Sequence, residues 1–157
     1  MAILKKNYKD INDTLRHIRL QVEESLPFAS KFCPKCKTPQ QLFNWLKPHL
    51  KYQLDPPKTE LLQSFPTLIK NNFYGIPGTG DCDCFSIAML AACYCQNWKG
   101  AKLYIKLAGR NKFCPVHIYT GVEINGKEYN LDLTNKIPFV ERNYPYKQKI
   151  YFKPLKT

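Results

Sequence analysis

Gly78-Thr79-Gly80-Asp81-Cys82-Asp83-Cys84-Phe85 is the stretch that decides how this chain folds. Its glycines allow a tight turn, and the run from Phe85 to Cys95 that follows is apolar on nearly every side. The pattern predicts a buried central helix, with Cys82 at the point where the loop becomes the helix. Because the unpaired N–H groups and the dipole of a helix N-terminus favour a thiolate, Cys82 is a candidate nucleophile.

Downstream of this helix the sequence changes to short β-rich runs, at Lys102 to Ala108, Val116 to Ile124 and Tyr129 to Thr134. The last two flank Asn125-Gly126, a strong hairpin signal, so we expect them to pair antiparallel. Lys149 to Phe152 is expected to add an edge strand. The predicted fold class is α+β, with N-terminal helices and the buried central helix packed on an antiparallel sheet.

Upstream of the glycine-rich stretch the sequence predicts helices. Asp10 to Leu26 carries one apolar helical stripe, which we expect Pro27 to end. Thr38-Pro39 has the residue types of an N-cap and a first turn, so a second helix should begin there. Further short helices are expected from Thr59 and at Ser64 to Pro66.

The length of 157 residues and the 44% hydrophobic content fit one compact domain with a real core. We expect a single domain over 1–157, with a helical N-terminal extension at 1–37. The core should span 38–134, followed by a C-terminal edge segment at 135–157.

Charge and cysteine content narrow the setting. The net charge is +12, but the cations are scattered, so a nucleic-acid partner is supported by charge alone. Seven cysteines exclude a fully paired set of disulfides within one chain. No secretory leader pattern is seen, and no run approaches the ~20 apolar residues of a membrane span. We therefore expect a reducing, cytoplasmic setting and no membrane partner.

His117 and Asp132 lie on the two predicted strands that flank the turn. His117 stands eight residues before Asn125 and Asp132 six residues after Gly126, so a small bulge would bring their side chains together. If the central helix packs on that face, Cys82 can meet His117. The three would then supply a nucleophile, a base and an orienting carboxylate.

At these residues the chain resembles the transglutaminase-like superfamily, a branch of the papain-like cysteine enzymes. The resemblance rests on Gly80-Asp81-Cys82-Asp83, Val116-His117-Ile118-Tyr119 and Asn130-Leu131-Asp132-Leu133-Thr134, within a match over roughly Thr38 to Thr134. In its short form the chain is similar to small members encoded among phage and prophage structural genes. This likeness implies a protein or peptide substrate, and a virion-associated setting with other phage structural proteins as partners.

The resemblance also implies a mechanism, in which Cys82 attacks an amide carbonyl, His117 transfers the proton and Asp132 fixes the histidine. The backbone N–H of Cys82 would form part of an oxyanion hole. A second donor is expected from upstream, and Tyr74, Asn72 and Gln63 are all candidates, between which the sequence does not choose.

Each of these residues also has a structural interpretation. Cysteine is often core filler, His117 alone fits a strand histidine, and Asp81 and Asp83 fit first-turn acids that would oppose thiolate formation. Where the family often carries a second acid, this chain has Cys84. A helix position two residues on points about 200° away, so Cys82 and Cys84 cannot both face His117, and we favour Cys82.

Cys33-Pro34-Lys35-Cys36 has the spacing of half a zinc site. No second pair with suitable spacing follows, since Cys93 and Cys95 are separated by one residue and His49 stands alone. We therefore interpret Cys33 and Cys36 as loop or packing residues, and expect neither a metal nor a cofactor.

Two functions follow from these residues. The first is a cysteine peptidase, amidase or acyltransferase that cleaves or transfers peptide or isopeptide amides through a thioester. The second is a catalytically silent transglutaminase-like module that serves as a protein-binding or structural component of a phage particle.

Overall fold

The computed structural model describes residues 3–6, 11–52, 60–63, 78–80, 82–110 and 115–153. Its helices are α1 (Ile11–Phe32), α2 (Pro39–Leu46), the 3-10 helix η1 (Lys47–His49) and α4 (Cys82–Tyr94). Its strands are β1 (Ile3–Lys6), β2 (Leu50–Tyr52), β3 (Glu60–Gln63), β4 (Gly78–Gly80), β5 (Ala101–Gly109), β6 (Pro115–Ile124), β7 (Lys127–Asn130) and β8 (Tyr146–Tyr151).

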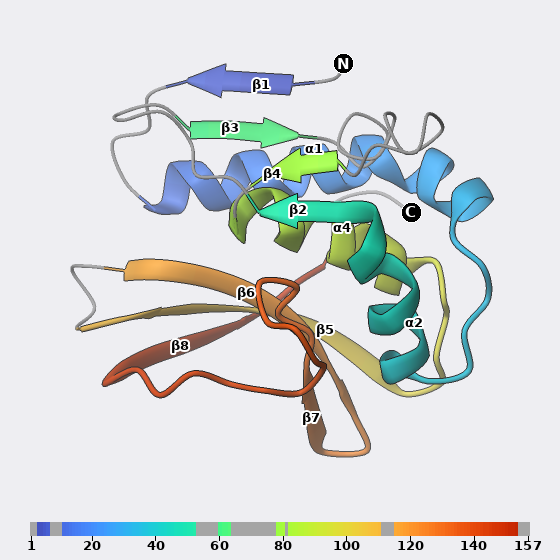
Figure 1. The fold of residues 1–157 in the computed structure, drawn as a ribbon. Helices are drawn as coiled ribbons and strands as arrows, with labels where there is room; N and C mark the ends of the chain where they lie inside the picture. The colour runs from blue at the N-terminus through green and yellow to red at the C-terminus, as the bar shows by residue number, and fades with distance from the viewer. Residues whose placement is uncertain are drawn as a thin grey trace.

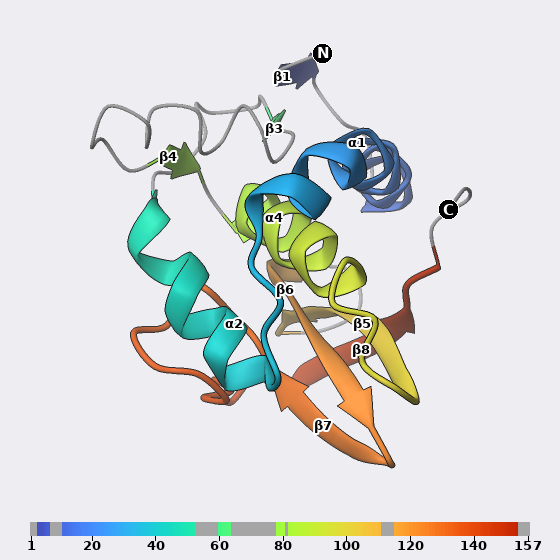
Figure 2. The same cartoon turned by 90° about the vertical axis from the view of Figure 1, so that its right-hand side faces the viewer.

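In the described part of the chain, three α-helices pack on a four-stranded antiparallel sheet of order β7-β6-β5-β8, which confirms the α+β class (Figure 1). Two small sheets accompany it, an antiparallel pair of β1 with β3 and a parallel pair of β2 with β4. Figure 2 shows α4 between α1 and the large sheet, with α2 beside it. The central helix is therefore covered on both sides.

This central position explains why α4 is apolar all round. Every residue from Asp83 to Cys93 is buried, and seven of the side chains, among them Ile87, Met89 and Leu90, have no exposed surface. Burying one large apolar side chain stabilises the fold by roughly 1.5–3 kcal/mol. The predicted buried helix is confirmed, and it sets the position of Cys82 at its first residue.

The first helix is longer than the sequence indicates. Pro27 lies inside α1 and does not end it, so that prediction was wrong. A proline within a helix costs about 3 kcal/mol because it removes one hydrogen bond and crowds the preceding turn. Beyond Pro27 the helix packs Phe28, Ala29 and Phe32 against the core, and this burial offsets the cost.

The second helix begins as predicted. Thr38 is the N-cap of α2, and its hydroxyl accepts a hydrogen bond from the Gln41 N–H at 3.2 Å. Pro39 occupies the first turn, where its missing N–H has no helical partner to lose. The α-helix ends at Leu46, and Pro48 lies in the short 3-10 turn that follows.

One prediction for the N-terminal half was wrong, and a second was incomplete. Glu60–Gln63 forms β3 and not a helix from Thr59, because its backbone pairs with β1. The segment at 1–37 is accordingly not only helical, since Ile3–Lys6 is a strand. The helix expected at Ser64 to Pro66 lies outside the described residues.

The hairpin at Asn125-Gly126 is confirmed, with positive φ angles of 53° and 80° that suit a two-residue turn between antiparallel strands. Its second strand ends at Asn130, earlier than the predicted Thr134. The predicted edge strand is present as β8, which pairs with β5. No helix in the described part of the chain is long and apolar enough to cross a membrane.

Candidate active site

The centre of the candidate site is a contact between His117 and Asp132. The imidazole Nε2 lies 2.6 Å from Asp132 Oδ2, and the two side chains are only 7% and 5% exposed. His117 comes from β6, whereas Asp132 follows β7, where the chain leaves the ladder after the Leu131 N–H bonds the Thr120 carbonyl. The structure thus brings together two of the three residues expected to form the triad.

The second carboxylate oxygen of Asp132 is held by its own chain. Oδ1 accepts hydrogen bonds from the Thr134 N–H at 3.0 Å and the Thr134 hydroxyl at 2.7 Å. Burial acts to raise the pKa of the Asp132 carboxyl, but the bonds from His117 and Thr134 outweigh it, so the pKa is lowered. Asp132 is therefore an oriented carboxylate that accepts a hydrogen bond from the imidazole.

Two tyrosine rings stack on the imidazole ring. The Tyr119 ring lies 5.4 Å from the His117 ring at an interplanar angle of 25°, and the Tyr144 ring lies 6.0 Å away at 28°. The Tyr119 hydroxyl donates to Glu141 at 2.5 Å. Tyr119 belongs to the motif noted around His117, although the sequence indicated no role for it. Tyr144 was not identified, because it comes from the segment after Asp132, where no regular pattern relates it to β6.

A buried lysine holds Glu141 in place. Lys106 Nζ on β5 lies 2.8 Å from carboxylate oxygens of both Glu141 and Glu128. Burial acts to raise the pKa of Glu141, but the hydrogen bonds from Lys106 and Tyr119 outweigh it and the pKa is lowered. A chain of contacts therefore runs from Lys106 through Glu141 and Tyr119 to the face of the His117 ring.

Cys82 is the first residue of α4 and is partly exposed, whereas Cys84 is fully buried. This difference supports Cys82 over Cys84 as the accessible thiol. The Cys82 Sγ lies 3.9 Å from Oδ1 of Asp83, a buried acid in the first helical turn. Because the first N–H groups of a helix have no helical acceptor, the start of α4 can serve an anionic intermediate.

The N-terminal end of α4 packs beside the same strand that carries the histidine. Ser86, one turn after Cys82, donates from its hydroxyl to the Ile118 carbonyl at 3.4 Å. Ile118 is part of the core, so the strand alternation places His117 on the opposite face, with Tyr119. The α4 helix thus covers the face of β6 opposite to His117, unlike the arrangement expected from the sequence, and a register shift between Ala108 and Gly109 interrupts the ladder beside His117.

Lys47 is another residue that the sequence did not single out. It lies in η1, and its Nζ donates to the Leu133 carbonyl, next to Asp132 in the chain. Burial lowers the pKa of Lys47, and the nearby Asp132 carboxylate partly opposes this. The contact ties the end of α2 to the Asp132 segment and adds a positive charge near the site.

The proposed second oxyanion donor stays a prediction. Asn72 and Tyr74 lie outside the described residues, as does Asp81. Gln63 is the last residue of β3, where its backbone pairs with Ile3. Only the backbone of that strand belongs to the described part of the structure.

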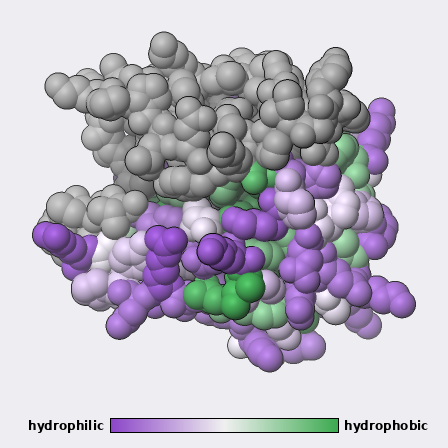
Figure 3. Space-filling view, viewed as in Figure 1, coloured by the Kyte–Doolittle hydropathy of each residue, from purple (hydrophilic) through white to green (hydrophobic). Residues whose placement is uncertain are grey.

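The segment joining β7 to β8 carries three exposed apolar side chains. Ile137 is 62% exposed, and Phe139 and Val140 are each 40% exposed. Figure 3 shows a small hydrophobic patch among hydrophilic residues on the lower part of the viewed face. Hydrogen bonds from the Phe139 N–H to the Asn130 carbonyl and from Asn135 to the Val140 carbonyl hold this segment next to the site.

A second group of cysteines is separate from Cys82. Gln96 bonds both the Cys36 N–H, at 2.7 Å, and the Pro34 carbonyl, at 3.1 Å, which brings Cys33 and Cys36 close to Cys93 and Cys95. Burial, with contributions from Cys95 and Cys36, raises the pKa of Cys33 to about 12. In the described ranges no three His, Cys, Asp or Glu side chains are placed to hold a metal ion.

No protein-family model matches the chain, and comparisons with curated proteins and with solved structures gave no match either.

Proposed function

We propose that the protein is a cysteine-dependent amide hydrolase or acyltransferase of the transglutaminase-like kind, with Cys82, His117 and Asp132 as its reactive group. The observation that carries this proposal is the buried contact of 2.6 Å between His117 and Asp132. A carboxylate in that position selects one imidazole tautomer and stabilises the imidazolium. The opposite ring nitrogen is then the one that exchanges a proton with a thiol.

Three further observations support the proposal. Cys82 begins a buried helix that contacts β6 one turn further on, and the residue is partly exposed. The rings of Tyr119 and Tyr144 limit the orientations open to the imidazole. A fixed orientation of the imidazole favours proton transfer, because even a small misplacement of a catalytic group slows the reaction.

The proposed reaction has two steps, formation of a thioester on Cys82 and its cleavage. The Cys82 thiol gives its proton to His117 and its sulfur attacks the carbonyl carbon of an amide. The C–N bond then breaks, and the leaving amine takes the proton from His117. The product is a thioester on Cys82. Water or a second amine then attacks this thioester and gives a proton to His117. The C–S bond breaks, and the released Cys82 sulfur takes that proton to restore the thiol.

The helix start supplies electrostatic support for this chemistry. Negative charge develops on the carbonyl oxygen during attack, and the backbone N–H of Cys82 is the first donor available to it. Asp132 keeps its negative charge, since its pKa is lowered despite its burial. The positive charge that forms on the imidazole is thus balanced by a neighbouring carboxylate.

Alkylation by iodoacetamide tests the proposal, with each cysteine followed by mass spectrometry of its peptide. Cys36 and Cys95 are matched internal controls, because they are also partly exposed and burial raises the pKa of both thiols. We expect Cys82 to react at least about tenfold faster than either control near neutral pH, because the thiolate is the reactive form. His117→Ala should remove this difference.

The result that contradicts the proposal is alkylation of Cys82 no faster than that of Cys36 and Cys95, unchanged by His117→Ala. Such a result would favour the silent module, in which the fold serves only to bind other proteins. Circular dichroism of the His117→Ala variant controls for loss of the fold.

A further inference from the structure

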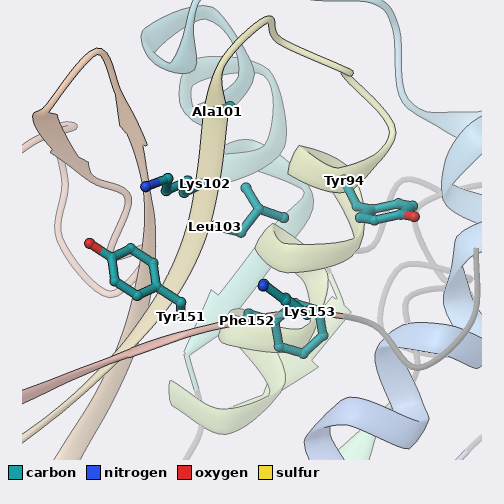
Figure 4. A pocket seen from close by; sticks show the side chains of 7 residues that line it. All are labelled: Tyr94, Ala101, Lys102, Leu103, Tyr151, Phe152 and Lys153. Carbon is teal, nitrogen blue, oxygen red and sulfur yellow. The ribbon is translucent and has the colours of Figure 1, made fainter.

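Two adjoining cavities lie at the end of β8, far from the candidate active site. The first, of about 490 Å³, is lined by residues that include Tyr94, Lys102 and Leu103 (Figure 4). Tyr151 and Phe152 belong to its wall and also to that of the second cavity. We call the two together the β8 groove. It adjoins Ala101–Leu103 at the start of β5, whereas His117 pairs with Ala108 near the other end.

The second cavity, of about 400 Å³, lies between α1 and the sheet. Its floor includes the aliphatic side chains of Leu15, Ile105 and Ile150, and Arg19 stands at its wall, 5.8 Å from the centre of the Phe152 ring. These side chains give the groove an apolar floor wide enough to receive a large side chain.

The described charged residues that line the two cavities are all cations. The first cavity is lined by Lys102 and Lys153 and the second by Arg16 and Arg19, with no Asp or Glu among the described residues that line either. Together with the net charge of +12, this favours a partner that carries carboxylates or phosphates.

β8 is the edge strand of the large sheet, and in the described ranges no strand pairs with its outer side. The Phe152 N–H donates to the Leu103 carbonyl at 2.8 Å, so the backbone N–H and C=O of Phe152 point towards β5. In an antiparallel ladder these directions alternate, and the backbone groups of Tyr151 and Lys149 therefore point outward. An extended chain beside β8 would find donors and acceptors there.

The side chains of β8 alternate in the same way. The side chains of Lys149 and Tyr151 lie on one face of the sheet, and those of Ile150 and Phe152 on the face towards the helices. Tyr151, at the edge, and Phe152 both line the groove. Figure 4 shows the same division, with Lys102 and Tyr151 on one side of β5 and Leu103 on the other. On the face of Tyr151 an added strand would meet Lys102, since Lys149 is already paired with Glu123 and Glu128. On the other face it would meet the apolar cavities.

From this complementarity we infer that the β8 groove binds an extended acidic peptide segment in which acidic and apolar residues alternate. The segment adds to the edge of β8 as a strand, its apolar side chains enter the two cavities, and its carboxylates meet Lys102 and Lys153. In this mode of recognition, backbone hydrogen bonds provide the affinity and the pockets for alternate side chains provide the specificity. It does not depend on the function proposed above.

A single-stranded nucleic acid is the other anionic partner to consider, and the groove favours it less. Bases bind by stacking on open aromatic rings. The Tyr151 ring already has Lys149 Nζ at 4.9 Å and Lys102 Nζ at 5.7 Å from its centre, and Arg19 approaches the Phe152 ring. The aliphatic floor and the outward backbone groups match a peptide and not a base.

The test measures binding of a fluorescein-labelled octapeptide of alternating Glu and Leu to the whole chain by fluorescence anisotropy. Three comparison probes are used: the Lys and Leu analogue, the Glu and Leu peptide N-methylated at alternate residues, and an oligothymidylate. We expect saturable binding of the unmodified acidic peptide with a Kd well below about 1 mM, and at least about tenfold weaker binding of the Lys and N-methylated peptides.

The test variant is Lys102→Glu with Lys153→Glu. Its control is Lys31→Glu with Lys37→Glu, which changes the net charge equally at exposed positions outside the groove. We expect the first pair to weaken peptide binding at least about tenfold and the second to weaken it less than about threefold. Amide hydrogen exchange on the wild-type chain should slow at Lys149 and Tyr151 when the peptide binds.

Several results would overturn the inference. One is the absence of saturable binding of the acidic peptide, and another is equal weakening of its binding by the two variant pairs. A third is that the N-methylated peptide binds as tightly as the unmodified one. The last is that oligothymidylate binds more tightly than the peptide and loses this binding in the groove variant. Because the readout is binding, none of these results depends on the reactivity of Cys82.

Discussion

Gly121 lies on β6 where no side chain fits, and its replacement by alanine tests the packing that supports the site. A Cβ built at Gly121 would lie 2.4 Å from the Tyr104 hydroxyl, 2.5 Å from Cζ of the same ring and 2.5 Å from the Tyr129 carbonyl oxygen. Ordinary contact begins near 3.4 Å, so three atoms must each move by nearly 1 Å. The Tyr104 side chain is fully buried and its hydroxyl donates to Asn130 at 2.6 Å, so the ring cannot readily move away from the added Cβ.

The expected cost follows from this crowding. Overpacking of a tight core costs typically 1–3 kcal/mol, and with backbone among the clashing atoms we expect Gly121→Ala to lower the free energy of unfolding by about 3 kcal/mol. For a chain of this length that corresponds to a fall in Tm of about 6–12 °C. Without the clash the sign would be reversed, because alanine in a strand is more favourable than glycine by about 0.5–1 kcal/mol.

Urea unfolding followed by circular dichroism measures this change, and Gly126→Ala is the matched control. A Cβ at Gly126 would have no atom within 4 Å, but the φ of this residue is +80°, so its replacement should cost only about 1–2 kcal/mol of backbone strain. A Gly121→Ala variant as stable as the wild type, or more stable, would refute the described packing of β6 on Tyr104.

Three other substitutions test separate features of the molecule. Asp132→Asn should lower the free energy of unfolding at neutral pH. Because the pKa of Asp132 is lowered in the fold, the stability it contributes is present above the usual carboxyl range and is lost as pH falls. Urea unfolding should therefore show the difference in unfolding free energy between variant and wild type becoming smaller towards pH ~3. A gap that widens in acid would contradict that sign. Thr38→Ala should cost about 1 kcal/mol through loss of the α2 cap and leave Cys82 alkylation unchanged, and a loss below about 0.3 kcal/mol would count against the cap. Pro27→Ala should raise the free energy of unfolding by about 1–3 kcal/mol, since Pro27 is exposed within α1; a lower stability would show that the proline is required there.

Local signals in the sequence were sufficient for the elements that carry the site. The apolar run after Cys82 predicted α4, the Asn125-Gly126 pair predicted the hairpin, and Thr38 predicted the start of α2. Each of these depends on residues close together in the chain. The contact of His117 with Asp132 followed from the hairpin, because the turn fixes which residues approach each other.

What the sequence did not reveal depends on distant partners. Glu60–Gln63 is a strand because β1 lies beside it, and α1 continues past Pro27 because the core covers its far end. The pairing of Lys106 with Glu141 joins positions 35 residues apart, which no short-range pattern relates. The same holds for Gln96, which gathers the second group of cysteines.

The ultraviolet absorbance of the Cys82 thiolate tests the central claim most directly. The measurement is the difference spectrum between the wild type and Cys82→Ser as pH is lowered, repeated in a His117→Ala background. If Cys82 and His117 act together, the thiolate signal should persist well below the usual thiol range near pH ~8.5 and disappear with His117→Ala. A signal that appears only in the usual range, and is the same in both backgrounds, would contradict a coupled thiol and imidazole.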